Sequence, residues 1–181
     1  MKLYHYEDFS VNTAIEQKRK RLKRFVNFYP PFLGAGVRIK EISEDLRTIE
    51  VHMPLRFWNK NYVGTHFGGS LYAMCDPFFM LILVNNLGKD YIVWDKSATI
   101  RFKKPGTGTM KALFHIPTER IEEIRAQADA QGKVEPAFQV QVTDQDGNVV
   151  AEIDKLLYVR RKDFLRRERP EVASPQAGRT S

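Results

Sequence analysis

The residues whose types and spacing suggest chemistry lie between Asn59 and Asp76, in the run N-K-N-Y-V-G-T-H-F-G-G-S-L-Y-A-M-C-D. Gly68 and Gly69 open an apolar, helix-like stretch, so the first backbone N–H groups of that helix lack intrahelical partners. Such a helix end binds an anion, or the oxyanion that forms when a thioester or ester carbonyl is attacked. Glycines at this position let a ligand approach the backbone closely.

Asp76 places a carboxylate on that otherwise apolar helix, where burying it unpaired costs several kcal/mol. Two interpretations are open. In the first, Asp76 is catalytic, and desolvation makes it a better base or nucleophile. In the second, Asp76 is structural and pairs with Lys96 or with backbone groups freed by Pro77. Because Asp76 follows Gly68 by eight residues, about 12 Å along a helix, the Asp76 of a partner subunit is better placed to serve the Gly68 end.

Other reactive side chains give weaker signals. The four histidines are dispersed without metal-ligand spacing, and a single cysteine excludes a cysteine-rich zinc site, so we expect no metal and no cofactor. His66 lies beside the glycines, where a substrate contact and a merely exposed side chain are both open. Cys75 reads as a packed apolar thiol. Ser70 reads as a first-turn helix residue, because no nucleophile elbow surrounds it.

Helices and strands on both sides must position this run. Three helices are expected: 12–29, capped by Asn12 or Thr13 and ended by Pro30-Pro31; 68–87, kinked at Pro77; and 118–131, capped by Thr118. Strands are expected near 37–42 and 49–53 before the second helix, at 91–103 and 110–116 after it, and at 138–142 and 149–159 after the third.

Two of these elements have a predicted buried face. In the first helix, the face contains Ile15, Leu22, Phe25, Val26 and Tyr29. In the strand 91–103, alternation places Trp94 with Ala98, Ile100 and Phe102, and places Asp95, Ser97, Thr99 and Arg101 opposite, with Lys96 breaking the apolar face.

The stretch from Gly68 to Leu87 is apolar around nearly its whole circumference and must be buried. We reject a membrane span, because the uncharged run after Asp76 is far shorter than the ~20 residues needed. An antiparallel sheet curved around this helix satisfies both patterns, which predicts an α+β fold. Such a sheet leaves its other face to be covered, so we expect an oligomer.

The chain has 181 residues, 43% of them hydrophobic, and a net charge of +7. No apolar signal segment follows Met1, so the expected setting is the reducing cytoplasm. Residues 18–24 hold six basic groups and no acid, and residues 160–181 hold seven against three acids, which leaves −3 for the remainder. The expected organisation is a basic N-terminal helix over 1–30, one domain over 31–162 and a tail over 163–181. For the basic face of the helix, a solvated surface, anionic lipid or ligand phosphates are all open.

The central run resembles the hot-dog superfamily of acyl-CoA thioesterases, over roughly residues 12–160. The phenylacetyl-CoA type carries Asn, Gly three later, His-Gly-Gly from six later and Asp fifteen later, and Asn61, Gly64, Gly68-Gly69 and Asp76 match this register. Phe67 stands at the His position. The form F-G-G-S-L-Y, the upstream Y-P-P-F-L-G-A-G and the downstream W-D-K-S-A-T-I-R-F-K-K-P-G resemble a thioesterase-like branch of the superfamily more closely.

This resemblance implies an acyl-CoA thioesterase that acts as a homodimer or a dimer of dimers with sites shared between subunits. Asp76 would be the general base or nucleophile, Asn61 would orient water or the thioester, and the N–H groups of Gly68 and Gly69 would hold the carbonyl oxygen. Asp95 and Ser97 are second-rank candidates on the strand where related enzymes place a water-assisting hydroxyl, and His66 and Phe67 are second-rank candidates beside the glycines. The expected contacts to the phosphates of CoA are Lys103, Lys104, Arg160 and Arg161.

Two other functions stay open. Because phenylalanine replaces the histidine of the motif, the protein could bind acyl-CoA without hydrolysing it. A module for nucleic acid or a membrane surface would use the basic ends, but no sequence signature supports nucleic-acid binding, and we expect none.

Overall fold

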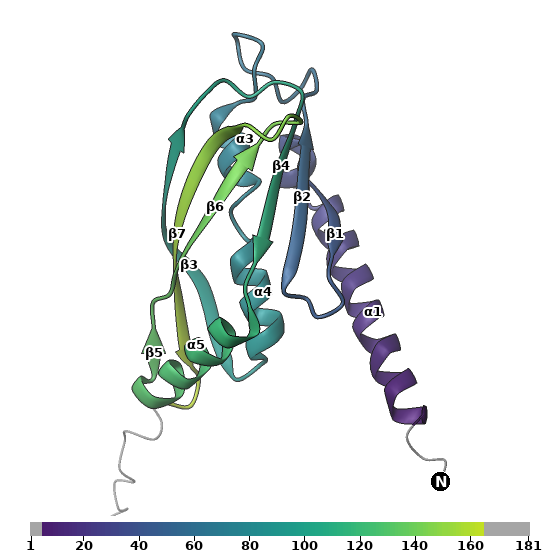
Figure 1. The fold of residues 1–181 in the computed structure, drawn as a ribbon, viewed down its shortest axis with the longest axis vertical. Helices are drawn as coiled ribbons and strands as arrows, with labels where there is room; N and C mark the ends of the chain where they lie inside the picture. The colour runs from purple at the N-terminus through teal and green to yellow at the C-terminus, as the bar shows by residue number, and fades with distance from the viewer. Residues whose placement is uncertain (1–4, 165–181) are drawn as a thin grey trace, which may run out of the picture.

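The computed structural model describes residues 5–164, with side chains from Thr13 onward. Seven strands form an antiparallel sheet in the order β1-β2-β4-β6-β7-β3, with β5 paired to β7 (Figure 1). The strands are β1 (Arg38–Ile42), β2 (Thr48–Pro54), β3 (Tyr91–Phe102), β4 (Thr109–His115), β5 (Lys133–Val134), β6 (Ala137–Thr143) and β7 (Val149–Arg161). The helices are α1 (His5–Phe28), α2 (Pro30–Ala35), α3 (Gly68–Ala73), α4 (Phe78–Leu87) and α5 (Thr118–Gln131).

The sheet curves around α3 and α4, so the predicted α+β arrangement is confirmed (Figure 1). Phe78 of α4 is fully buried, and its ring centroid lies 4.9 Å from that of Phe114 on β4. Phe79 packs against the same ring at 5.2 Å. Apolar side chains on most sides of α4 therefore fill the concave side of the sheet, as the sequence pattern requires.

The predicted continuous helix is wrong at its centre, because α3 ends at Ala73 and α4 begins at Phe78. Pro77 has no backbone N–H and occupies the N-cap of α4, so the break falls where proline interrupts helical bonding. Taken together, Gly68–Leu87 is long and apolar enough to cross a membrane by length and composition, and half of that window is buried within the fold. The break places Asp76 between two helices rather than along one.

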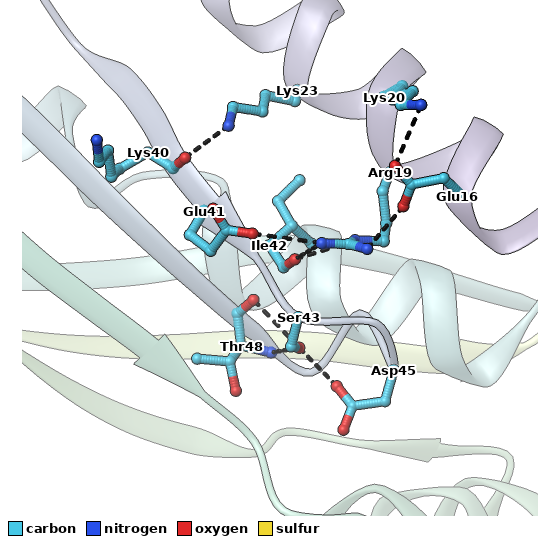
Figure 2. A network of polar contacts seen from close by, with 10 residues as sticks. All are labelled: Glu16, Arg19, Lys20, Lys23, Lys40, Glu41, Ile42, Ser43, Asp45 and Thr48. Carbon is cyan, nitrogen blue, oxygen red and sulfur yellow. Dashed lines mark hydrogen bonds and ion pairs between the residues drawn. The ribbon is translucent and has the colours of Figure 1, made fainter.

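Helix α1 covers the free edge of β1 through side-chain contacts to the strand backbone. The amide of Asn27 donates to the Ile39 carbonyl at 3.3 Å and accepts from the Ile39 N–H at 2.7 Å. Lys23 donates to the Lys40 carbonyl at 2.6 Å, and Arg19 reaches the Ile42 carbonyl, also at 2.6 Å (Figure 2). Part of the basic run is therefore structural, because it satisfies strand groups that would otherwise be open to another chain.

Three expectations for the helices are wrong. Asn12 and Thr13 lie inside α1 rather than at its start, because the helix begins at His5. Phe25 and Tyr29 point outward, while Val26 takes the buried position. The predicted cap of α5 is also displaced, since Pro117 occupies the N-cap and Thr118 is the first helical residue. Of the tail expected over 163–181, residues 165–181 lie outside the part of the chain that the structure describes.

Candidate functional site

A buried lysine lies at the centre of the candidate site. Lys155 points inward from β7, between the buried side chains of Ile153 and Leu157, and is only 1% exposed. A buried ammonium group is costly unless it is paired. Its Nζ lies 2.9 Å from Oδ1 of Asp95 and 3.1 Å from Oδ1 of Asp76, so two carboxylates from different elements surround one cation.

Asp76 reaches this lysine from the break between α3 and α4. Its Oδ1 accepts hydrogen bonds from Lys155 and, at 2.8 Å, from the hydroxyl of Tyr72 one helical turn earlier. The side chain of Asp76 is 47% exposed, and no partner of its Oδ2 is recorded among the described residues. Asp76 is thus held by one oxygen and presents the other to solvent, which is the geometry that a base or nucleophile needs.

Asp95 reaches the same lysine because a β-bulge changes the side-chain alternation of β3. The pairing of β3 with β7 shifts register between Asp95 and Ser97, which leaves Lys96 as the extra residue. The predicted faces of this strand are therefore wrong on the N-terminal side of the bulge. Asp95 points inward, whereas Trp94 points outward and stacks on Tyr158 with ring centroids 4.5 Å apart.

The electrostatics of this cluster follow from burial and pairing. Burial raises the pKa of Asp95, although the contact with Lys155 opposes the shift. Burial alone would lower the pKa of Lys155, but its hydrogen bonds and charge interactions with Asp95 and Asp76 raise the pKa overall. Burial, followed by the hydrogen bond to Asp76, raises the pKa of Tyr72. Lys155 therefore stays protonated at neutral pH and lies as a cation between the two aspartate side chains.

The predicted pairing of Asp76 with Lys96 does not occur, because Lys96 instead contacts Glu135 at 2.6 Å. Cys75, next to Asp76, is fully buried, and burial raises the pKa of its thiol. Cys75 thus has the packed position expected from the sequence rather than that of a reactive thiolate.

The two glycines lie at the N-terminus of α3, at the opposite end of that helix from Asp76. Among the residues that the structure describes, no hydrogen-bond partner is recorded for the N–H groups of Gly68 and Gly69. The Phe67 ring lies so close that a Cβ built on Gly69 would be 2.4 Å from it, and a Cβ on Gly68 would be 3.1 Å from the ring of Phe102. A surface hollow of about 400 Å³ borders Phe67 and Gly69.

The loop before α3 is stabilised by its own side chains. The Asn61 amide donates to Thr65 Oγ1 at 2.8 Å, and its oxygen accepts from the N–H groups of Val63 and Thr65. His66 is buried, so the expectation of an exposed histidine is wrong. Its Nε2 is 2.9 Å from the Gly108 carbonyl, and burial lowers the pKa of His66 despite that bond. In this arrangement Asn61 and His66 shape the loop and do not contact the Asp76 carboxylate.

The predicted CoA contacts fall at two distant places. Lys103 pairs with Glu152 at 2.9 Å near the start of β7, whereas Arg160 and Arg161 lie at its end. Arg160 follows Glu152 by eight residues, which span ~26 Å of strand, so the two groups do not share one phosphate site. Ser97 is exposed on the outer face of β3 and, unlike Asp95, lies away from the cluster.

Lys155 and Tyr72 are the members of the cluster that the sequence analysis missed. A signal for Lys155 was present, since I-D-K-L-L-Y-V places a lysine at an inward position of an otherwise apolar alternation. Tyr72 precedes Asp76 by four residues, the spacing at which helical side chains meet. No group of three or more histidine, cysteine, aspartate or glutamate side chains suited to a metal occurs between residues 5 and 164.

The sequence matches one described protein family over most of its length. Residues 18–159 match the family described as "Domain of unknown function (DUF4442)". No curated protein matches the sequence.

Solved structures share the fold. A protein of unknown function from Pseudomonas aeruginosa, described as a probable thioesterase, is 23% identical with a TM-score of 0.72, over 78% of this chain and 95% of that one. A thioesterase from Haemophilus influenzae is 14% identical with a TM-score of 0.58, over 79% and 90%. The E. coli PaaI protein of the phenylacetic acid degradation operon is 17% identical with a TM-score of 0.57, over 83% and 95%. The chain therefore has the hot-dog fold of thioesterase-like proteins and belongs to the DUF4442 family.

Proposed function

We propose that the protein is an acyl-CoA thioesterase that hydrolyses a thioester to a free acid and CoA. The observation that carries this proposal is Asp76, a half-exposed carboxylate held through one oxygen by the buried Lys155. An aspartate that served only to neutralise Lys155 would not need to present an oxygen to solvent, since Asp95 already pairs with that lysine. The fold is also shared with proteins described as thioesterases.

In the proposed reaction, Asp76 takes a proton from water while the water oxygen attacks the thioester carbonyl, or Asp76 itself attacks that carbonyl and water cleaves the resulting anhydride. The carbonyl oxygen becomes an oxyanion and accepts hydrogen bonds from the N–H groups of Gly68 and Gly69. In the first route the C–S bond then breaks, and the CoA thiolate receives the proton held by Asp76. In the second route the C–S bond breaks as the anhydride forms, and the thiolate receives a proton from the water that cleaves the anhydride. Lys155 holds one oxygen of Asp76 in place and Asp95 fixes Lys155, so both are positioning residues.

The sites are proposed to be shared between subunits of a homodimer or a dimer of dimers. Asp76 lies beyond the C-terminal end of α3 and the free N–H groups lie at its start, separated by ~9 Å of helix. A thioester carbonyl cannot contact both ends within one chain, whereas two chains can combine one end from each. No strand among residues 5–164 pairs with the outer edge of β3 along its 12 residues, which supports an interface there.

Lys103 and Lys104 are the better candidates for the phosphates of CoA. They directly follow Phe102, whose ring contacts Gly68 at the proposed oxyanion end. A bound phosphate would replace their present carboxylate partners, which are Glu152 and Asp144. We propose a cytoplasmic setting, where acyl-CoA is available.

A second candidate is an acyl-CoA-binding protein without hydrolase activity. The observation that favours it is Phe67, which stands at the histidine position of the motif and lies over Gly69. In that case the Phe67 ring would block the approach of the carbonyl to the N–H groups while the acyl chain still binds.

A thiol-release assay on short-chain, long-chain and aromatic acyl-CoAs, with calorimetric binding of the same compounds, separates these functions. Catalytic release of CoA from at least one class supports the thioesterase. Binding of acyl-CoA without turnover of any class supports the binding protein, and no binding of any class contradicts both.

A further inference from the structure

Exposed aromatic and basic side chains gather on the outward face of α1. Phe25 and Phe28 are 65% and 70% exposed, and Phe25 lies on the side of the helix opposite Asn27, which contacts β1. They border a surface hollow of about 730 Å³, together with neighbouring cations and a third aromatic ring. We define the α1 outer face by the residues Lys20, Arg21, Arg24, Phe25, Phe28 and Tyr29.

Contacts within the protein account for only part of this face, in which Lys20 pairs with Glu16 at 3.3 Å (Figure 2). Arg19 and Lys23 bond to the backbone of β1, but no ion pair of Arg21 or Arg24 is recorded among the described residues. Phe25 stacks on Tyr29 with centroids 5.7 Å apart, so the exposed rings form a continuous patch rather than scattered single residues. A contiguous apolar patch bordered by polar groups marks an interaction surface.

We propose that the α1 outer face docks the protein on an anionic membrane surface. Its cations match acidic phospholipid headgroups, and Phe25 and Phe28 can enter the boundary between headgroups and acyl chains. A second copy of the same face is a poor partner, because it would bring Arg21 and Arg24 of both copies together. Nucleic acid would use the cations but has no need for two phenylalanines on one helical stripe.

The position of α1 suits peripheral docking. The helix lies along β1, at the opposite end of the strand order from β3, and its N-terminal part projects beyond the body (Figure 1). Docking there leaves the cluster of Asp76, Asp95 and Lys155 and the free edge of β3 uncovered. Membrane binding therefore does not depend on the proposed catalytic site.

The test uses the full chain and co-sedimentation with two kinds of vesicle, phosphatidylcholine alone and phosphatidylcholine with phosphatidylserine. We expect at least about tenfold stronger binding to the anionic vesicles, lost as salt is raised. The double variant Arg21→Glu/Arg24→Glu should weaken this binding at least about tenfold. The variant Phe25→Ser/Phe28→Ser should also weaken it about tenfold with the charge intact.

The matched control is Lys133→Glu/Lys162→Glu, which changes the net charge equally at exposed positions near the opposite edge of the sheet. This control should keep at least half of the wild-type binding. Circular dichroism verifies that every variant is folded, which the exposure of the substituted side chains leads us to expect.

Three results would overturn the proposal. Equal binding to both kinds of vesicle would remove the role of anionic lipid. If only the arginine variant loses binding, while Phe25→Ser/Phe28→Ser binds vesicles and duplex DNA like wild type, the face is a general polyanion site. If wild type ignores vesicles and the phenylalanine variant has a smaller mass in sedimentation velocity, the face joins two copies of the chain.

Discussion

Replacing Lys155 with methionine removes the ammonium group between Asp76 and Asp95 and keeps the apolar stem. Since Nζ lies 3.1 Å from one carboxylate and 2.9 Å from the other, the two Oδ1 atoms are at most about 6 Å apart. Two unit charges at that distance repel by ~3 kcal/mol at an effective dielectric constant of about 20. Lys155→Met also removes both attractions to the ammonium group, and removing one partner of a buried ion pair costs about 3 to 5 kcal/mol. Solvent around the half-exposed Asp76 screens part of this effect, so we expect Lys155→Met to lose about 3 kcal/mol of unfolding free energy at neutral pH.

The pH dependence of that loss identifies its cause. Without the lysine, the pKa of Asp95, already raised by burial, rises further in the folded state. The folded variant then binds a proton more readily than the unfolded chain, so its stability increases as pH falls through the raised pKa. Urea unfolding at about pH 7 and about pH 5 measures this change, and Lys155→Met/Asp95→Asn should regain most of the loss at neutral pH.

Lys96→Met is the matched control, because Lys96 follows Asp95 on β3 and forms an exposed ion pair with Glu135. Its loss should stay below about 1 kcal/mol and show little pH dependence. If Lys155→Met were as stable as Lys96→Met, or equally destabilised at both pH values, the amine would not lie between the two carboxylates.

Three further predictions test other parts of the structure. In Gly69→Ala the new methyl group would lie 2.4 Å from the Phe67 ring, so this exposed ring must shift to make room, and the unfolding free energy should stay within about 1 kcal/mol. The methyl group hinders close approach of a carbonyl to the Gly69 N–H, so thioester hydrolysis should fall at least about tenfold; unchanged hydrolysis would exclude the Gly69 N–H as an oxyanion donor. Burial lowers the pKa of His66 in the folded protein, so the unfolded chain takes up a proton first as pH falls below about 6.5. Wild type should therefore lose unfolding free energy below that pH, and His66→Gln should lose less. Urea unfolding at several pH values measures this difference. Asn27→Ala leaves the Ile39 N–H without its partner, so the unfolding free energy measured in urea should fall by about 1 to 2 kcal/mol. The control Gln17→Ala, at an exposed position of the same helix, should change it little. Equal values for the two variants would mean that α1 does not stabilise the edge of β1.

The order of helices and strands could be predicted from the sequence because most elements carry a strong apolar period. Strand β2 alternates buried and half-buried side chains as expected, and α4 is apolar on most sides and buried. The break before Phe78 was harder to foresee, since a proline can either kink a helix or divide it. Neighbouring packing decides between the two outcomes.

The site was predictable only in part, because its central contacts join segments far apart in the chain. Asp76 stood out as a charge on an apolar helix, but its partner Lys155 lies 79 residues later. The bulge at Lys96 turns Asp95 inward, and no local pattern distinguishes such a bulge from regular alternation. Exposure of Phe25 likewise depends on which side of α1 meets β1.

The most direct test of the proposed function is a single-turnover measurement with Asp76→Asn. An acyl-CoA that wild type hydrolyses is bound to each protein at saturation, and the release of CoA is followed by rapid quench. We expect the first-order rate of the variant to be at least about a hundredfold lower, while the dissociation constant of the acyl-CoA changes less than about threefold. A folded Asp76→Asn protein that releases CoA at the wild-type rate would contradict the assignment of Asp76 as base or nucleophile.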